Sequence, residues 1–99
     1  MDTLDRLQRW YLSMCDGDWE HDPGFSIEVL DNPGWMIELR LVDRFENLRV
    51  PNIADERTEQ DWIFIHEADN SLLIACGPLN LKEAIDNFLE IVEQESKET

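Results

Sequence analysis

The chain has 99 residues, 42% of them hydrophobic, and its 23 acidic residues against eight basic ones give a formal net charge of −15. This length suits one domain over residues 1–99 with a modest core, so several domains are excluded. No apolar run approaches the roughly 18 residues of a membrane span, and no signal pattern opens the sequence, so we expect a cytoplasmic protein. The acidity argues against nucleic acid and anionic membranes as partners and favours a basic macromolecule.

A helix is predicted over residues 3–15, because apolar residues recur there at steps of three and four. Asp2 or Thr3 is expected to cap its start, and Gly17 to end it, since glycine tolerates the left-handed conformation that follows many helices. Trp10 neighbours the apolar stripe and is expected to pack as well. The stripe consists of Leu4, Leu7, Tyr11 and Met14.

Residues 18–24 are predicted to form an irregular loop, because they are polar and include Pro23 and Gly24. Trp19 lies in this loop among acidic residues. Tryptophan prefers places where apolar packing meets a polar group, and protein interfaces are such places. Of the four tryptophans in the chain, Trp19 therefore has the strongest claim to an interface.

A β-hairpin is predicted next. Apolar and polar residues alternate over residues 25–29, and the alternation resumes from Trp35 to Leu41. Residues 31–34 form a turn signal between the two runs, because they contain proline followed by glycine. Trp35 is in phase with the apolar positions of its strand, so its side chain is expected in the core.

The segment from residue 43 to residue 60 has a weaker pattern. The apolar residues of 45–50 fit a short edge strand, and Pro51 with the charged run 55–59 indicates a solvated loop after it. An exposed edge over residues 45–50 would allow two copies of the chain to pair, so the sequence is compatible with a monomer and with a homodimer.

A second β-hairpin is predicted from residues 61–67 and 71–76, and Gly77-Pro78 then ends the sheet. The first of these strands is apolar on both faces, so the two faces compete for the core. One face carries Trp62 and Phe64, and the other carries Ile63 and Ile65.

The last predicted element is an amphipathic helix that begins after Asn80. Asn80 is expected to cap it with Glu83 as the reciprocal partner, and the polar tail 93–99 is expected to fray. The order of elements indicates an α+β fold: an antiparallel sheet of four to five strands in two hairpins, with the N- and C-terminal helices packed on one face. The buried stripe of the last helix is Leu81, Ile85, Phe88, Leu89 and Val92.

The sequence carries no strong catalytic signature. Its four glycines are scattered through turns and no spacing matches a metal site, so neither a cofactor nor a metal is expected. Cys15 and Cys76 are interpreted as reduced thiols, with a disulfide between them as the alternative. His21 and His66, with nearby carboxylates, leave a small hydrolase, metal-dependent or not, as an alternative function if these groups converge in a pocket.

An ordered set of motifs extends over almost the whole chain. It consists of Leu7, Trp10 and Tyr11, then Cys15-x-Gly17-Asp18-Trp19-Glu20-His21, then Leu30-Asp31-Asn32-Pro33-Gly34-Trp35, then Asp61-Trp62, and finally Gly77-Pro78-x-Asn80-Leu81. This set resembles the tryptophan-rich immunity proteins of bacterial polymorphic toxin systems, specifically the immunity protein 53 family. The resemblance implies a small cytoplasmic protein, encoded beside a toxin, that binds the toxin domain and blocks it without enzymatic activity.

Charge and resemblance together predict how a toxin would be bound. An acidic surface suits the cationic face of a basic toxin such as a nuclease, and we expect inhibition by stoichiometric occlusion. A stand-alone acidic interaction module without a toxin partner is the second alternative. The expected toxin contacts are Asp18, Trp19, Glu20, Asp22, Asp55, Glu56, Glu59 and Asp61. The motif residues interpreted as structural are Asn32, Pro33, Gly34, Trp35, Trp62, Gly77 and Pro78.

Overall fold

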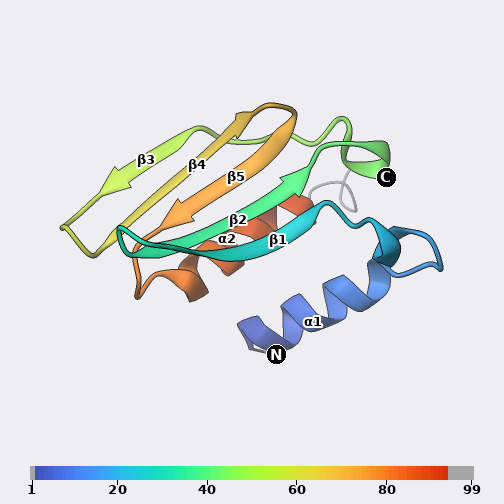
Figure 1. Cartoon of the computed structure of the whole chain (residues 1–99), viewed down its shortest axis with the longest axis horizontal. Helices are drawn as coiled ribbons and strands as arrows, with labels where there is room; N and C mark the ends of the chain where they lie inside the picture. The colour runs from blue at the N-terminus through green and yellow to red at the C-terminus, as the bar shows by residue number, and fades with distance from the viewer. Residues whose placement is uncertain (1, 94–99) are drawn as a thin grey trace.

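The computed structural model describes residues 2–93, which form a five-stranded antiparallel sheet with two α-helices packed on one face (Figure 1). The strand order is β1-β2-β5-β4-β3. The α+β fold with terminal helices on one face is therefore confirmed. In chain order the elements are α1 (Thr3–Met14), the 3-10 helix η1 (Trp19–His21), β1 (Phe25–Leu30), β2 (Gly34–Arg40), the 3-10 helix η2 (Asp43–Phe45), β3 (Ile53–Glu56), β4 (Trp62–Ala68), β5 (Ser71–Cys76) and α2 (Leu81–Val92).

Both predicted hairpins are present. In the first, β1 pairs with β2 over its whole length, from Phe25 opposite Leu39 to Leu30 opposite Gly34. In the second, β4 pairs with β5 around a tight turn at Asp69-Asn70, whose φ angles are 53° and 59°. Asp and Asn tolerate this left-handed conformation better than other residues with a side chain, which is why the chain reverses here.

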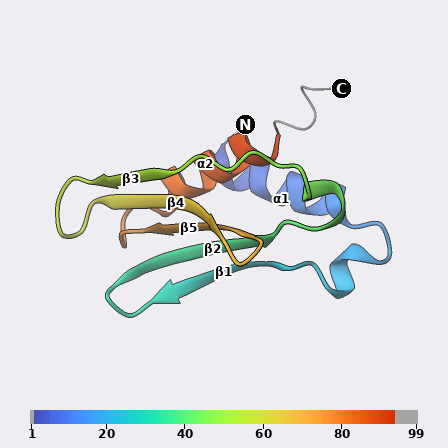
Figure 2. The same cartoon turned by 90° about the horizontal axis from the view of Figure 1, so that it is seen from above.

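The core lies between the sheet and α2. Ile37, Ile74 and Ile65 are neighbours across three adjacent strands, and all three are fully buried on the face that the helices cover. Phe88 and Leu89 of α2 are fully buried as well. Figure 2 shows α1 and α2 on the same side of the sheet. The isoleucines of β4 therefore join the main core, and the face of β4 with Trp62 points to the other side.

Helix α1 follows the prediction closely in extent but not in its buried face. Asp2 caps it, since its carboxylate accepts a hydrogen bond of 2.8 Å from the Asp5 N–H. Met14 is buried as expected, but Leu4 is 60% exposed and Tyr11 is 44% exposed, so the stripe was wrong at these two positions. The residues of α1 that pack against the core are Leu7, Trp10 and Met14, so the buried face of the helix includes Trp10 and leaves out Leu4 and Tyr11.

The segment between the hairpins differs from the prediction. Phe45 and Leu48 are buried in the core, but they lie in η2 and the irregular chain after it, so the strand expected at 45–50 was wrong. The edge strand is β3 instead, which pairs with β4, so the solvated loop expected from Pro51 through the charged run 55–59 was wrong for Ile53–Glu56. All four residues of β3 are exposed, so the strand has no buried face to mark it by alternation.

Helix α2 begins and ends where the amphipathic pattern predicts. The Asn80 side chain, however, makes no capping hydrogen bond to it, because this side chain turns towards β4. The expected tail beyond Glu93 lies outside the described residues. Neither α1 nor α2, the α-helices of residues 2–93, is long and apolar enough to cross a bilayer.

Candidate binding surfaces

The two acidic segments predicted to bind a partner lie at opposite ends of the sheet (Figure 1). Asp22 is beside Arg40, the last residue of β2. Glu56 lies opposite Trp62, which is the first residue of β4. The Trp62 ring lies close to Gly34, which is the first residue of β2. Since β2 rises about 3.3 Å per residue, the two segments are about 20 Å apart. They therefore do not form one continuous patch.

The Trp19 side chain is engaged in packing within the protein. Its ring meets that of Trp10 edge to face with 5.9 Å between centroids, and the Tyr11 ring is also 5.9 Å away. Trp10 in turn contacts Phe25 and Phe88, at 5.1 and 4.9 Å. This aromatic cluster joins α1, η1, β1 and α2, so Trp19 anchors the acidic loop to the body of the protein.

Two carboxylates hold the loop in shape. Asp16 accepts hydrogen bonds of 3.0 Å from the N–H groups of Trp19 and Asp18, and these bonds lower the pKa of Asp16. The Glu20 carboxylate accepts hydrogen bonds from the backbone N–H groups of Gly17 and Asp16. Hydrogen bonds from the backbone N–H of Glu20 itself, and then from those of Gly17 and Asp16, lower the pKa of Glu20. Glu20, a predicted contact, therefore also has a structural role.

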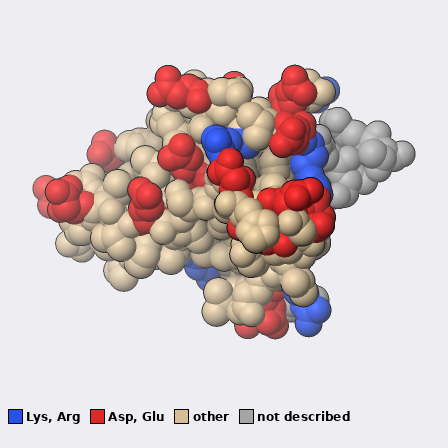
Figure 3. Space-filling view, turned by 45° about the vertical axis from the view of Figure 1, so that its right-hand side comes forward, with Lys and Arg blue, Asp and Glu red and all other residues tan. Residues whose placement is uncertain are grey.

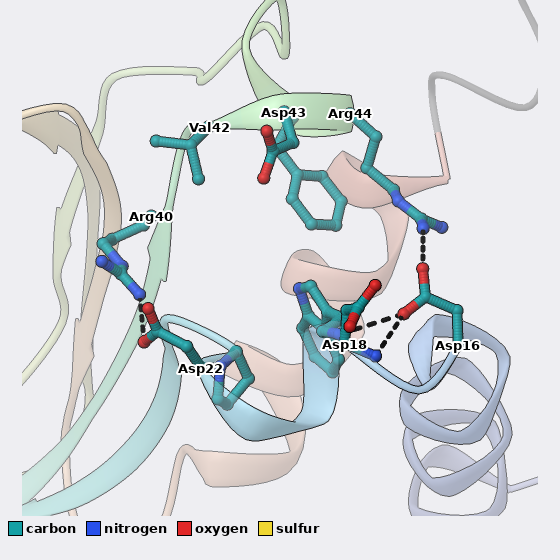
Figure 4. A pocket seen from close by; sticks show the side chains of 10 residues that line it. Asp16, Asp18, Asp22, Arg40, Val42, Asp43 and Arg44 are labelled. Atoms are coloured by element: carbon teal, nitrogen blue, oxygen red, sulfur yellow. Dashed lines mark hydrogen bonds and ion pairs between the residues drawn. The ribbon is translucent and has the colours of Figure 1, made fainter.

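A cavity of about 370 Å³ opens between this loop and η2 (Figure 4). On one side Arg40 donates to Asp22 at 2.7 Å, and on the other Arg44 lies 3.6 Å from Asp16. The carboxylates of Asp18 and Asp43, which also line it, make no ion pair within residues 2–93. Four aspartates against two arginines leave this hollow with excess negative charge.

At the other end of the sheet, one cation organises the second acidic segment. Arg57 lies 2.8 Å from carboxylate oxygens of Asp55 and Asp61 and 2.7 Å from Glu83 of α2. Asn80 completes the network, because its Nδ2 donates to Asp61 and Glu83 and its Oδ1 accepts from the backbone of β4. Hydrogen bonds from Arg57 and then Asn80 lower the pKa of Asp61.

The network changes the interpretation of that segment. Asp55 and Asp61 are used to hold the β3–β4 turn against α2, whereas Glu56 and Glu59 are exposed and make no ion pair among the described residues. Sequence reasoning missed this arrangement. Its signals were a single arginine inside an acidic run and the spacing of Asn80 and Glu83, read as a capping box.

Several of the motif residues interpreted as structural lie close together at this same end. The Trp35 Nε1–H donates to the Pro78 carbonyl at 3.1 Å. Gly34 lies so close to β5 that a Cβ at this position would be 2.3 Å from the carbonyl oxygen of Cys76. A Cβ on Gly77 would likewise be 2.3 Å from the carbonyl oxygen of Gln60. Motifs far apart in the sequence thus pack against one another and close one end of the sheet.

Groups suited to catalysis are dispersed. His21 lies in η1 and His66 in the middle of β4, on an exposed position. Both cysteines are free, and burial raises the pKa of the Cys76 thiol to about 11. Within residues 2–93, no three His, Cys, Asp or Glu side chains are grouped so that they could hold a metal ion.

Comparison with known proteins gives one finding. The family model described as immunity protein 53 matches residues 4–93, from the first turn of α1 to the end of α2. Neither the curated proteins nor the solved structures gave a match. The matched range contains both hairpins, both acidic segments and every motif residue interpreted as structural.

Proposed function

The chain belongs to the immunity protein 53 family, and we propose that it binds a cognate toxin domain in the cytoplasm and neutralises it without enzymatic activity. The observation that carries this proposal is the family match over nearly the whole fold. An immunity protein protects the cell that makes the toxin, so binding must be tight enough to keep the free toxin scarce. One inhibitor then occupies one toxin domain.

The charge supports a basic toxin as the partner. The chain carries a net charge of −15, and acidic side chains are spread over the face seen in Figure 3, where basic ones are fewer. A nuclease domain, which binds phosphates, presents the complementary cationic surface. Opposite fields of this size accelerate encounter and orient the two proteins before contact.

Occlusion is compatible with the size of the protein. A stable interface of ordinary size covers about 800 Å² on each partner. The accessible surface here is 6457 Å², so such an interface would use about an eighth of it. A rigid sheet of this kind can cover an active-site cleft or a substrate-binding surface of the toxin without any rearrangement of its own.

Among the predicted contacts, those with unpaired charge are the ones we assign to steering. Asp18, Glu56 and Glu59 are exposed and make no ion pair within the described part of the chain. Asp22, Asp55 and Asp61, by contrast, already hold arginines. A basic partner approaching either end of the sheet would therefore meet Asp18 at one end and the two glutamates at the other.

Co-expression tests the proposal. The toxin domain encoded next to this chain is expressed in a sensitive host, alone and with the chain, and the purified pair is titrated by calorimetry. We expect growth to be restored and a one-to-one complex to form. An acidic domain of similar size and charge is the control, and it should neither rescue growth nor bind. Toxicity that persists with a folded chain present would reject the proposed function.

A further inference from the structure

Within residues 2–93, both α-helices lie on one face of the sheet and the other face carries none. We call this other face the open face and define it by the side chains that alternate with the core positions of the strands. Its central row crosses all five strands, from Glu28 of β1 through Met36, Ala75 and Phe64 to Ala54 of β3. Met36, Ala75 and Phe64 are half-buried, because neighbouring side chains shield them but no helix or strand of the described chain covers them.

The row beside it has one apolar residue between two polar ones. Leu73 of the central strand β5 lies between Glu38 of β2 and His66 of β4. On the other side of the central row, the Trp62 ring lies 5.3 Å from that of Phe64 at a tilt of 34°, and Trp62 is opposite Glu56. The open face thus has an apolar centre bordered by glutamates.

The glutamates of this border are available to a partner. Glu28, Glu38 and Glu56 make no ion pair within residues 2–93, and Glu38 accepts a single weak hydrogen bond of 3.4 Å from Ser71. Arg40, at the end of the same face, is paired with Asp22. An apolar centre with a polar border is the usual anatomy of a protein interface.

From this arrangement we infer that the open face is the surface that docks the toxin. The inference rests on the proposed function and adds the location and the chemistry of the contact. The matching toxin surface presents apolar side chains to Phe64 and Leu73 and places lysines or arginines over the three glutamates. The acidic segments at the two ends of the sheet then flank the docked toxin and steer it.

The charge of the chain favours a basic toxin over a second copy on the open face, and the open face over the outer side of α1. A second copy of the chain would bring the glutamates of one open face onto those of another, which is unfavourable for two bodies of charge −15. The outer side of α1 also exposes apolar residues, with Leu12 at 71%, but Arg9 is exposed on the same helix and would repel a basic partner.

The first test places a cation in the centre of the open face. Leu73→Arg should fold, because the side chain can extend along the surface towards Glu38, but it should repel a basic toxin. We expect the Kd for the toxin domain to rise about tenfold or more. Leu12→Arg is the matched control on α1, and its Kd should stay within about twofold of the wild type. Circular dichroism and thermal unfolding establish that both variants are folded.

A second pair of variants separates local contact from general attraction. Glu28→Lys on the open face and Glu90→Lys on α2 change the net charge equally, and both positions are exposed. Long-range steering therefore weakens to a similar degree in both. A docking surface at the open face predicts that Glu28→Lys raises Kd several-fold more than Glu90→Lys does.

Methionine methyl signals give a reading that needs no variant. Met36 lies on the open face, whereas Met14, the last residue of α1, is buried in the core on the helix-covered side, so their methyl resonances report on the two sides of the sheet. In the complex with the toxin domain, the Met36 signal should shift or broaden and the Met14 signal should not. The reverse pattern would place the toxin on the helices and overturn the inference.

The remaining outcomes are also decisive. If folded Leu73→Arg binds as the wild type does, the open face is not the docking surface, even though the proposed function stands. If the wild type dimerises in light scattering and Leu73→Arg separates the dimer, the face joins two copies and the inference is wrong. If the wild type neither binds nor rescues, the proposed function and this inference fall together.

Discussion

At the scale of single residues, Arg57 shows why the charge of a residue does not reveal its use. The sequence around it has the composition of a solvated acidic loop, yet the Arg57 guanidinium binds three carboxylates, from β3, from the turn before β4 and from α2. Asp61 consequently binds a cation, while Glu59, two positions earlier, is exposed without one in the described range. Only the fold brings Glu83 of α2 to this place, so the spacing of Asn80 and Glu83 pointed to a capping box and did not reveal the partner Arg57.

The ion pair between Asp61 and Arg57 predicts that the free energy of unfolding depends on pH. The pKa of Asp61 is lowered in the folded protein, so the unfolded chain, with a value of about 3.9, takes up the proton first. The stabilisation is present above about pH 4 and is lost as the pH falls through the folded-state pKa. In urea titrations, the stability gap between the wild type and Asp61→Asn should therefore narrow from pH 5 downwards.

Arg57→Leu checks the cause of this effect. Removing the cation should reduce the pH dependence of stability as Asp61→Asn does, and the double variant should show little further reduction. Comparing variants at each pH also cancels most of the general relief of charge repulsion in acid. A gap of constant size from pH 5 to pH 2 would contradict the assignment.

Trp19 gives a second prediction at this scale. Because its ring packs edge to face on Trp10 and is only half-buried, Trp19→Ala should lower the free energy of unfolding by about 2 kcal/mol, less than a fully buried tryptophan would cost. Leu79→Ala, at a position 87% exposed, is the control and should change stability by less than about 0.5 kcal/mol. Unchanged stability of Trp19→Ala in urea would show that the cluster does not anchor the loop.

At the scale of elements, burial on one side decided what could be predicted. The paired strands β1 and β2 alternate visibly, and the Asp69-Asn70 turn marks the second hairpin. The edge strand β3 is exposed throughout and has no such pattern. Phe45 gave a false strand signal because it is buried from a 3-10 turn, where apolar character follows contact and not alternation.

The closed end of the sheet yields a prediction for one element contact. In Gly34→Ala, the new Cβ would lie 2.3 Å from the backbone oxygen of Cys76, and β5 cannot retreat because β4 pairs with it on the other side. We expect a loss of about 1–3 kcal/mol in the free energy of unfolding, measured in urea. An alanine variant as stable as the wild type would mean that β2 and β5 separate easily at this end.

At the scale of the whole molecule, the overall charge follows from the sequence, but where the charges lie in space does not. A charge of −15 indicated a basic partner from the sequence alone, and the family match supports a toxin. The chain could not reveal that its two acidic segments stand at opposite ends of β2, because that separation follows from the strand order. Nor could it show that Phe64 and Leu73 share a face, since only the β4–β5 register aligns them.

The global charge predicts the kinetics of association. The rate constant for binding the toxin domain, measured by stopped flow, should fall about tenfold or more between low salt and about 0.5 M salt. The dissociation rate constant should change much less, because it depends on close contacts. Leu73→Arg should instead raise the dissociation rate constant more than it lowers the association rate constant. An association rate that is indifferent to salt would argue against a basic partner.

The uncovered side of the sheet also bears on how such a protein can diversify. On one side of the central strands the core is formed by Ile37, Ile65 and Ile74, which are buried. On the other side lie Met36, Phe64 and Leu73, which are only half-buried and contribute less to the core. Substitutions among the second group can therefore accumulate with little effect on folding. Family members could adapt to changes in the toxin by substitutions on one face of the sheet, while the core that determines the fold stays the same.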